Sequence, residues 1–160
     1  MRRGAGLAAL ALLLFLGSQA GRAEQAEGKA VPPGAVVVAV ARESPLQRLT
    51  LEALRRAFLG LPVERDGIRV LPLVNRSDPL LYEIFLQKVV FLSARSYTRL
   101  LLSRTLRTGA PRPPEYTDLA ALREALAARP GAVAVLWARD VHADPRLRVL
   151  QVLWAGEEAP

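Results

Sequence analysis

The sequence of 160 residues contains no cysteine and only one histidine, His142. Without cysteine the protein has no disulfide scaffold, no thiolate zinc site, no cysteine nucleophile and no lipid-modified N-terminal cysteine. A metal site would therefore have to use oxygen ligands and His142. Lysine is scarce too, since only Lys29 and Lys88 occur among 22 basic residues. We interpret the excess of arginine as codon bias rather than selection for anion contacts.

The chain also lacks an apolar run long enough to cross a bilayer. The run Ala5–Leu16 has about a dozen residues, fewer than the about 20 that a spanning helix needs. It follows Arg2 and Arg3 and precedes small residues, which is typical of a secretory signal peptide over residues 1–23, cleaved after Ala20 or Ala23. An uncleaved anchor is the alternative. We expect a periplasmic or secreted protein with no stable membrane insertion after cleavage.

The remainder has the composition of one folded domain. The hydrophobic fraction of 51% excludes disorder for the bulk of the chain. Cleavage after Ala23 would remove three arginines and no acid, lowering the formal net charge from +7 to +4. Residues 24–34 are small, polar and end in prolines, so we expect a flexible lead. Residues 35–155 are then expected to form a single domain.

Hydrophobic patterning predicts a mixed α/β architecture. The β-branched run 35–41 indicates a strand covered on both faces, and 68–74, 132–138 and 147–154 are further strand candidates. Helices are predicted after the caps Thr50, Asp78, Ser93 and Thr117. The order β, α, β, α, α, α, β, β implies a small sheet with helices on its faces. The predicted core consists of Val36, Val38, Leu54, Phe58, Val70, Leu81, Phe85, Leu122, Val133 and Val135.

No catalytic motif is present, so the sequence predicts neither an enzyme nor a cofactor or metal site. His142 lies between Asp140 and Asp144, but the adjoining Asp-Pro indicates a surface turn. The carboxylates of Glu64 and Asp66 could pair, but Asp66-Gly67 immediately before a predicted strand indicates a turn. Four arginines of the third helix spread around half of its circumference, so no nucleic acid partner is expected.

One loop is a candidate anion site. Asn75, Arg76, Ser77 and Asp78 lie between a predicted strand and a predicted helix, where backbone amides and the arginine could hold an oxyanion. The alternative is a capped helix, in which Asp78 occupies the free amides with its own carboxylate. The spacing alone favours the cap.

Four segments in order resemble small exported proteins similar to the phosphate-binding component of ABC transporters, of the type-2 periplasmic-binding-protein class. They are Leu49–Gly60, Asp66–Arg76, Phe85–Val89 and Pro130–Val133. The resemblance implies a single-lobe α/β domain and a phosphate loop that includes Arg76, Ser77 and Asp78. Residues 79–82 stand where that family has Gly-Ser-Gly-Thr.

The resemblance implies an exported module that binds phosphate or another oxyanion weakly in association with an ABC transport system. Its partner would be a membrane permease or sensor protein. The alternative is an extracytoplasmic protein-interaction or sensor accessory domain that kept the fold and lost the ligand site. A basic groove containing Arg76 would favour the first function, and an exposed apolar patch would favour the second.

Overall fold

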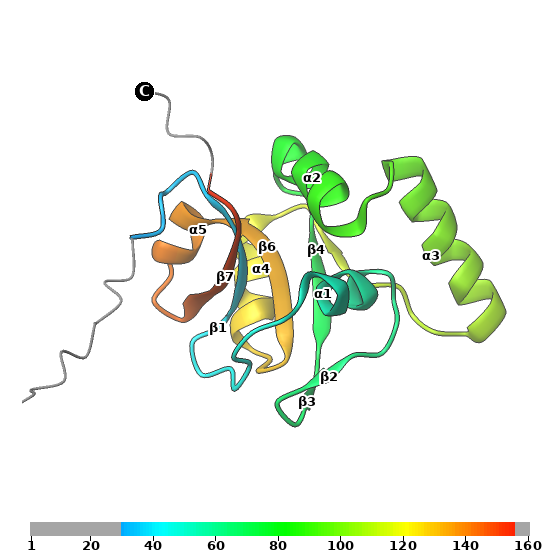
Figure 1. Ribbon diagram of the computed structural model, residues 1–160, viewed down its shortest axis with the longest axis horizontal. Helices are drawn as coiled ribbons and strands as arrows, with labels where there is room; N and C mark the ends of the chain where they lie inside the picture. Colours follow the sequence, from blue (N-terminus) through cyan, green and yellow to red (C-terminus); the bar gives the residue numbers. More distant parts are fainter. Residues whose placement is uncertain (1–29, 156–160) are drawn as a thin grey trace, which may run out of the picture.

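The computed structural model describes residues 30–155 (Figure 1). The expected signal peptide and residues 24–29 of the expected lead lie outside this range. Within it, no helix combines the length and apolar character that a membrane span requires.

A five-stranded mixed sheet forms the centre of the domain, in the order β5-β4-β6-β1-β7. β4 runs parallel to β5 and β6, whereas β1 is antiparallel to β6 and β7. The predicted fold class, a small mixed sheet with helices on its faces, is confirmed. The strands are β1 (Val36–Ala41), β4 (Leu71–Asn75), β5 (Glu115–Tyr116), β6 (Ala132–Trp137) and β7 (Leu147–Trp154).

The segment predicted as one strand over 68–74 contains parts of two strands. The first, β3 (Ile68–Arg69), pairs with β2 (Glu64–Arg65) in a hairpin. The second is the main-sheet strand β4, which begins only at Leu71. The chain changes partner between them, because Val70 donates its backbone N–H to Val63 and Leu71 donates to Gly131. The expected turn is confirmed at Asp66 and Gly67, whose φ angles are 51° and 77°.

Helices cover both faces of the sheet. α1 (Leu51–Phe58), α2 (Pro79–Phe85), a π-helical turn (Leu86–Val90) and α3 (Ala94–Thr108) lie on one face. α4 (Leu119–Ala127) and α5 (Ala138–His142) pack on the other. Every residue of the predicted core is buried. Alternate residues of β1 pack into the apolar cores on the two opposite faces of the sheet, which explains why its apolar run is continuous.

The caps agree with the prediction at three helices and differ at one. Thr50, Asp78 and Ser93 accept backbone hydrogen bonds from the first turns of α1, α2 and α3. At α4 the N-cap is Asp118, not Thr117: the Asp118 carboxylate accepts from Ala120 N at 3.0 Å. Threonine and aspartate are both good N-cap residues, so the sequence pattern could not decide between Thr117 and Asp118.

Candidate functional site

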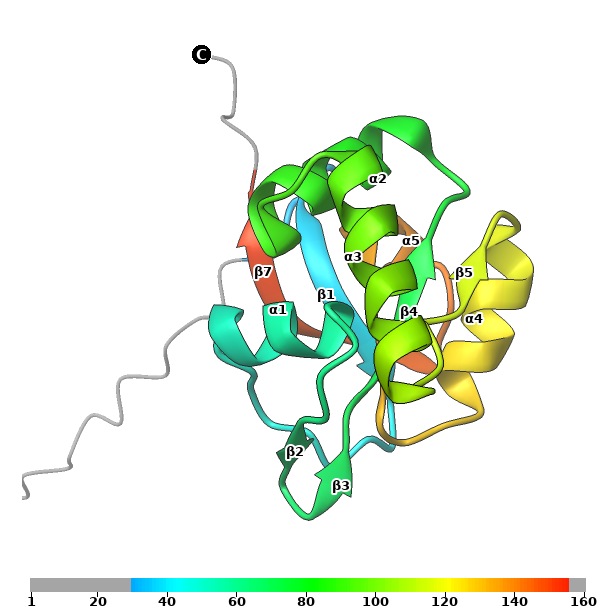
Figure 2. The ribbon, with the colours of Figure 1, turned by 90° about the vertical axis from the view of Figure 1, so that its right-hand side faces the viewer.

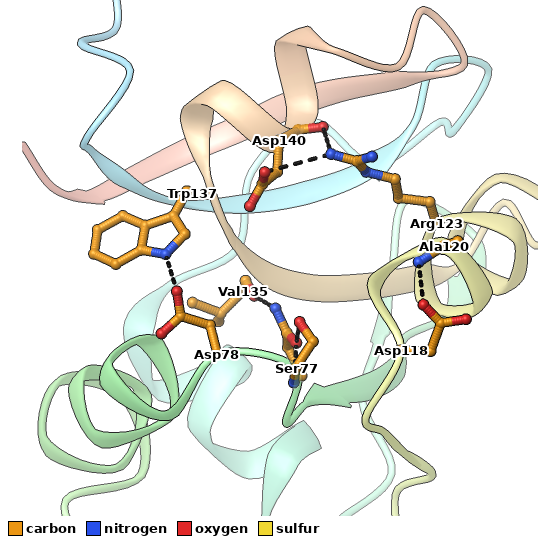
Figure 3. Close-up of polar contacts among 9 residues, drawn as sticks. Ser77, Asp78, Asp118, Ala120, Arg123, Val135, Trp137 and Asp140 are labelled. Carbon is orange, nitrogen blue, oxygen red and sulfur yellow. Dashed lines mark hydrogen bonds and ion pairs between the residues drawn. The ribbon is translucent and has the colours of Figure 1, made fainter.

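The predicted anion loop follows β4 and is closed by its own side chains. Asn75 is 6% exposed, and its Oδ1 accepts from both the backbone N–H of Ser77, at 2.9 Å, and the Ser77 hydroxyl, at 2.7 Å. Its Nδ2 donates to the carbonyl of Val135 on the neighbouring strand at 3.4 Å (Figure 3). Asn75 therefore takes up the two donors of Ser77 that an anion would need.

Both carboxylate oxygens of Asp78 also have partners. Oδ1 accepts from Leu81 N at 3.0 Å, which caps α2. Oδ2 accepts from the indole N–H of Trp137 at 2.9 Å, as Figure 3 shows. The indole hydrogen bond, followed by the Leu81 N–H, holds the pKa of Asp78 below its usual range. The carboxylate is consequently charged at neutral pH and would repel an approaching anion.

Arg76 is held by groups on two other segments. Its Nη1 lies 3.2 Å from Oε2 of Glu115, and its guanidinium carbon lies 4.2 Å from the ring centroid of Tyr82. Its backbone N–H donates to Tyr116 O at 2.7 Å. Burial raises the pKa of the Tyr82 hydroxyl. The guanidinium charge is thus offset by Glu115, although 40% of the Arg76 side chain stays exposed.

The four predicted loop residues lie together in the structure, but their polar groups form hydrogen bonds and an ion pair with other groups of the protein. Trp137 and Glu115 complete these contacts, and neither was predicted from the sequence. Trp137 ends β6, and the contact arises because β6 runs parallel to β4, so that the carboxyl ends of both strands lie at one edge of the sheet. The sequence carries no signal for this strand pairing, nor for Glu115, which follows a proline run.

The remaining titratable candidates are separated into structural pairs. Asp140 pairs with Arg123 at 3.4 Å, and Asp144 pairs with Arg146 at 2.8 Å. Hydrogen bonding to Arg146 lowers the pKa of Asp144. The surface turn predicted at Asp144-Pro145 is confirmed, because Leu147 N donates to the carbonyl of Asp144 at 3.0 Å. His142 precedes this turn as the exposed last residue of α5, a short helix whose Ala138 and Val141 are buried. Across residues 30–155, no group of three or more acidic or histidine side chains is placed to hold a metal ion.

Comparison with known proteins shows a partial likeness to solved structures. No protein-family model matches the chain, and no curated protein matches it. Among solved structures, an ABC-type phosphate transport receptor from Vibrio cholerae aligns with a TM-score of 0.46 and 15% identity. The alignment covers 73% of this chain and 45% of the receptor. The chain therefore spans less than half of the receptor's length.

A second feature of the surface is the outer side of α3, which lies at the edge of the molecule in Figure 1 and in front in Figure 2. Only Tyr97 and Leu101 of its fifteen residues are buried. Leu102 is 47% exposed and Leu106 is 77% exposed. Leucines with this exposure form an apolar surface that the domain itself leaves uncovered.

α3 is attached to the domain through an aromatic contact and through Arg104, whose Nε donates to the carbonyl of Gly60 at 3.0 Å. The Tyr97 hydroxyl donates to the carbonyl of Phe58, at the end of α1, over 2.8 Å. The rings of Phe58 and Tyr97 both pack edge-on against Phe85, with centroid distances of 4.8 and 5.8 Å. Burial strongly raises the pKa of Tyr97, so this donor keeps its proton throughout the physiological range. The anchor fixes the inner side of α3 and leaves its outer side accessible.

Proposed function

We propose that the protein is an extracytoplasmic protein-interaction module that kept a binding-protein-like domain and does not use the Asn75–Asp78 loop as an oxyanion site. The observation that carries the proposal is the closed hydrogen bonding of that loop. Ser77 donates to Asn75, Trp137 donates to Asp78, and Arg76 faces Glu115. An incoming oxyanion would have to displace these contacts and approach two carboxylates.

The outer side of α3 is the proposed docking surface. At 100° per residue, Arg95, Arg99, Leu102 and Leu106 fall within an arc of about 60°. α3 contains four arginines and no acidic residue. Two copies meeting through this face would place like charges together, so charge complementarity favours a different protein whose apolar patch is flanked by acidic side chains.

Site-specific photo-crosslinking in the native cells tests this function. A photoreactive residue at position 106 is expected to give a discrete adduct, whereas one at exposed Ala121 on α4 gives none. Combining position 106 with Arg95→Glu and Arg99→Glu should abolish the adduct, because the charges then repel. Equal adducts from positions 106 and 121, or an adduct that survives charge reversal, would contradict the proposal.

The weak binding of phosphate or another oxyanion at the loop remains the second candidate function. The exposed part of the Arg76 guanidinium is what supports it. It predicts oxyanion-dependent stabilisation that Arg76→Ala removes, with a dissociation constant of about 1 mM at best. Both candidate functions are compatible with association with an ABC permease or a sensor protein, since either membrane protein can present an acidic docking patch.

A further inference from the structure

A cleft with a volume of about 140 Å³ lies beside the first residues of β4, at the opposite end of that strand from the Asn75–Asp78 loop. Its walls come from the end of α1, from the segment joining β3 to β4, and from the proline-rich segment between α3 and β5. β5 pairs only with Val74 and Asn75. The earlier residues of β4 therefore have no strand neighbour on the side where the cleft opens.

This edge of β4 is unsuited to an added strand. Leu71 N donates to Gly131 O on the β6 side, and Val74 N donates to Pro114 O on the β5 side. The backbone groups of successive strand residues point alternately to the two neighbouring strands, so those of Pro72 point to the β5 side. Proline has no backbone N–H to donate there. Three further prolines, Pro111, Pro113 and Pro114, line the cleft. An extended peptide would find few ladder donors here, so the cleft suits a compact ligand.

Three arginines from separate segments line the cleft: Arg69 of β3, Arg112 of the proline-rich segment and Arg129 after α4. No acidic residue lines it, and none of the three forms an ion pair with a residue in the range 30–155. Glu64 stands opposite Arg69 in the hairpin register but does not pair with it. Apart from Gly60, the other lining residues are apolar: Ala57, Leu61, Val70, Leu71, Leu73 and the prolines.

A close backbone approach brings together the segments that carry two of these arginines. A Cβ atom at Gly131 would lie 2.2 Å from the carbonyl oxygen of Arg69, a distance that no side chain tolerates. Gly131 follows Arg129 by two residues, so the contact holds the turn that carries Arg129 against β3. The glycine thereby permits an arrangement in which two guanidinium-bearing segments border one cleft.

We propose that this cleft binds a small organic anion that carries at least two negative charges on an apolar body. Guanidinium groups pair with carboxylate or phosphate oxygens through paired N–H donors. The apolar residues of the lining favour a hydrocarbon or aromatic body over a fully hydrated inorganic ion. The site shares no residue with the loop or with the outer side of α3, so it stands independently of the proposed function.

Titration calorimetry at constant ionic strength, with phthalate, sulfate and neutral benzyl alcohol as probes, tests the proposal. Phthalate should bind the wild-type protein more tightly than sulfate, and benzyl alcohol should not bind. The variant Arg69→Gln/Arg112→Gln/Arg129→Gln should bind phthalate at least about tenfold more weakly. The matched variant Arg95→Gln/Arg99→Gln/Arg107→Gln removes the same charge from α3 and should bind phthalate as the wild type does.

Three results would overturn the proposal: no phthalate binding at about 10 mM, equal loss of affinity in both triple variants, or equal affinity for sulfate and phthalate. Chemical-shift mapping guards against a variant that fails to fold, because it is done on the wild-type protein. Phthalate should shift the amide resonances of Leu71 and Leu73 and leave those of Ser77 and Leu106 unchanged. Shifts centred on Ser77 would assign the binding to the loop instead.

Discussion

The indole N–H of Trp137, at the end of β6, donates a 2.9 Å hydrogen bond to the Asp78 carboxylate that also caps α2. One aspartate thus joins the start of a helix to the end of the neighbouring strand. The same two hydrogen bonds favour the charged carboxylate and lower its pKa. A feature that resembles an anion-binding loop in the sequence is, in the folded protein, occupied by the protein's own anion.

Trp137→Phe should remove the side-chain donor and reduce the free energy of unfolding by about 1–2 kcal/mol at pH 7. Because the folded-state pKa of Asp78 lies below its unfolded value, the stabilisation is complete above the unfolded pKa and is lost as the pH falls through the folded one. The difference between wild type and variant should therefore shrink as the pH falls below about 4. Denaturant melts across this range measure it.

The control for that pH dependence is the Asp78→Ser background, in which a capping oxygen remains but no carboxylate titrates. There, Trp137→Phe should cause a loss of stability that does not change between pH 7 and acid. A pH-dependent loss in this background would show that another group is responsible.

Phe58→Ala should lower the free energy of unfolding by roughly 3–5 kcal/mol. The ring is fully buried and packs 4.8 Å from the ring of Phe85, centroid to centroid. Chemical denaturation followed by circular dichroism gives the value. A loss under about 1 kcal/mol would mean that α1 does not pack as described.

Tyr97→Phe should cost about 1–3 kcal/mol, because it leaves the buried carbonyl of Phe58 without its donor. Hydrogen exchange of the α3 amides should accelerate more than exchange in β1 or β6, since this contact anchors α3. Ser103→Ala, an exposed change on the same helix, should alter stability by less than about 0.5 kcal/mol. Uniform acceleration across the domain would contradict a local anchoring role.

The sequence predicted strands at the positions of β1 and β6 because β-branched and apolar runs are typical of strands covered on both sides. It also located Thr50, Asp78 and Ser93, whose short polar side chains precede helical spacing. It did not reveal α5, because five residues are too few to establish a helical period. Nor did it reveal the π-helical turn Leu86–Val90, whose apolar spacing continues that of α2.

The sequence defined the candidate loop along the chain but did not reveal the partners that surround it in space. Asn75, Arg76, Ser77 and Asp78 are adjacent in sequence, so their proximity required no knowledge of the fold. The partners that satisfy them, Trp137 and Glu115, are separated from them by 59 and 39 residues. Such contacts depend on strand order, which the pattern of apolar residues does not specify.

Export predicts that the mature N-terminus begins at Gly21 or Glu24. Mass spectrometry of the N-terminal peptide, from protein recovered outside the cytoplasm of the native cells, identifies the first residue. Replacing Leu12 and Leu13 with arginine interrupts the apolar run and should retain an uncleaved precursor. A wild-type protein that still begins with Met1 would contradict cleavage.

The most direct measurement of the central claim is calorimetric titration of the mature protein with phosphate, sulfate and molybdate, in parallel with Arg76→Ala. If the loop is closed by its own hydrogen bonds, the wild type and Arg76→Ala should give indistinguishable curves, with no dissociation constant below about 1 mM assignable to the loop. Micromolar phosphate binding by the wild type that Arg76→Ala abolishes would contradict the account and establish the loop as a phosphate site.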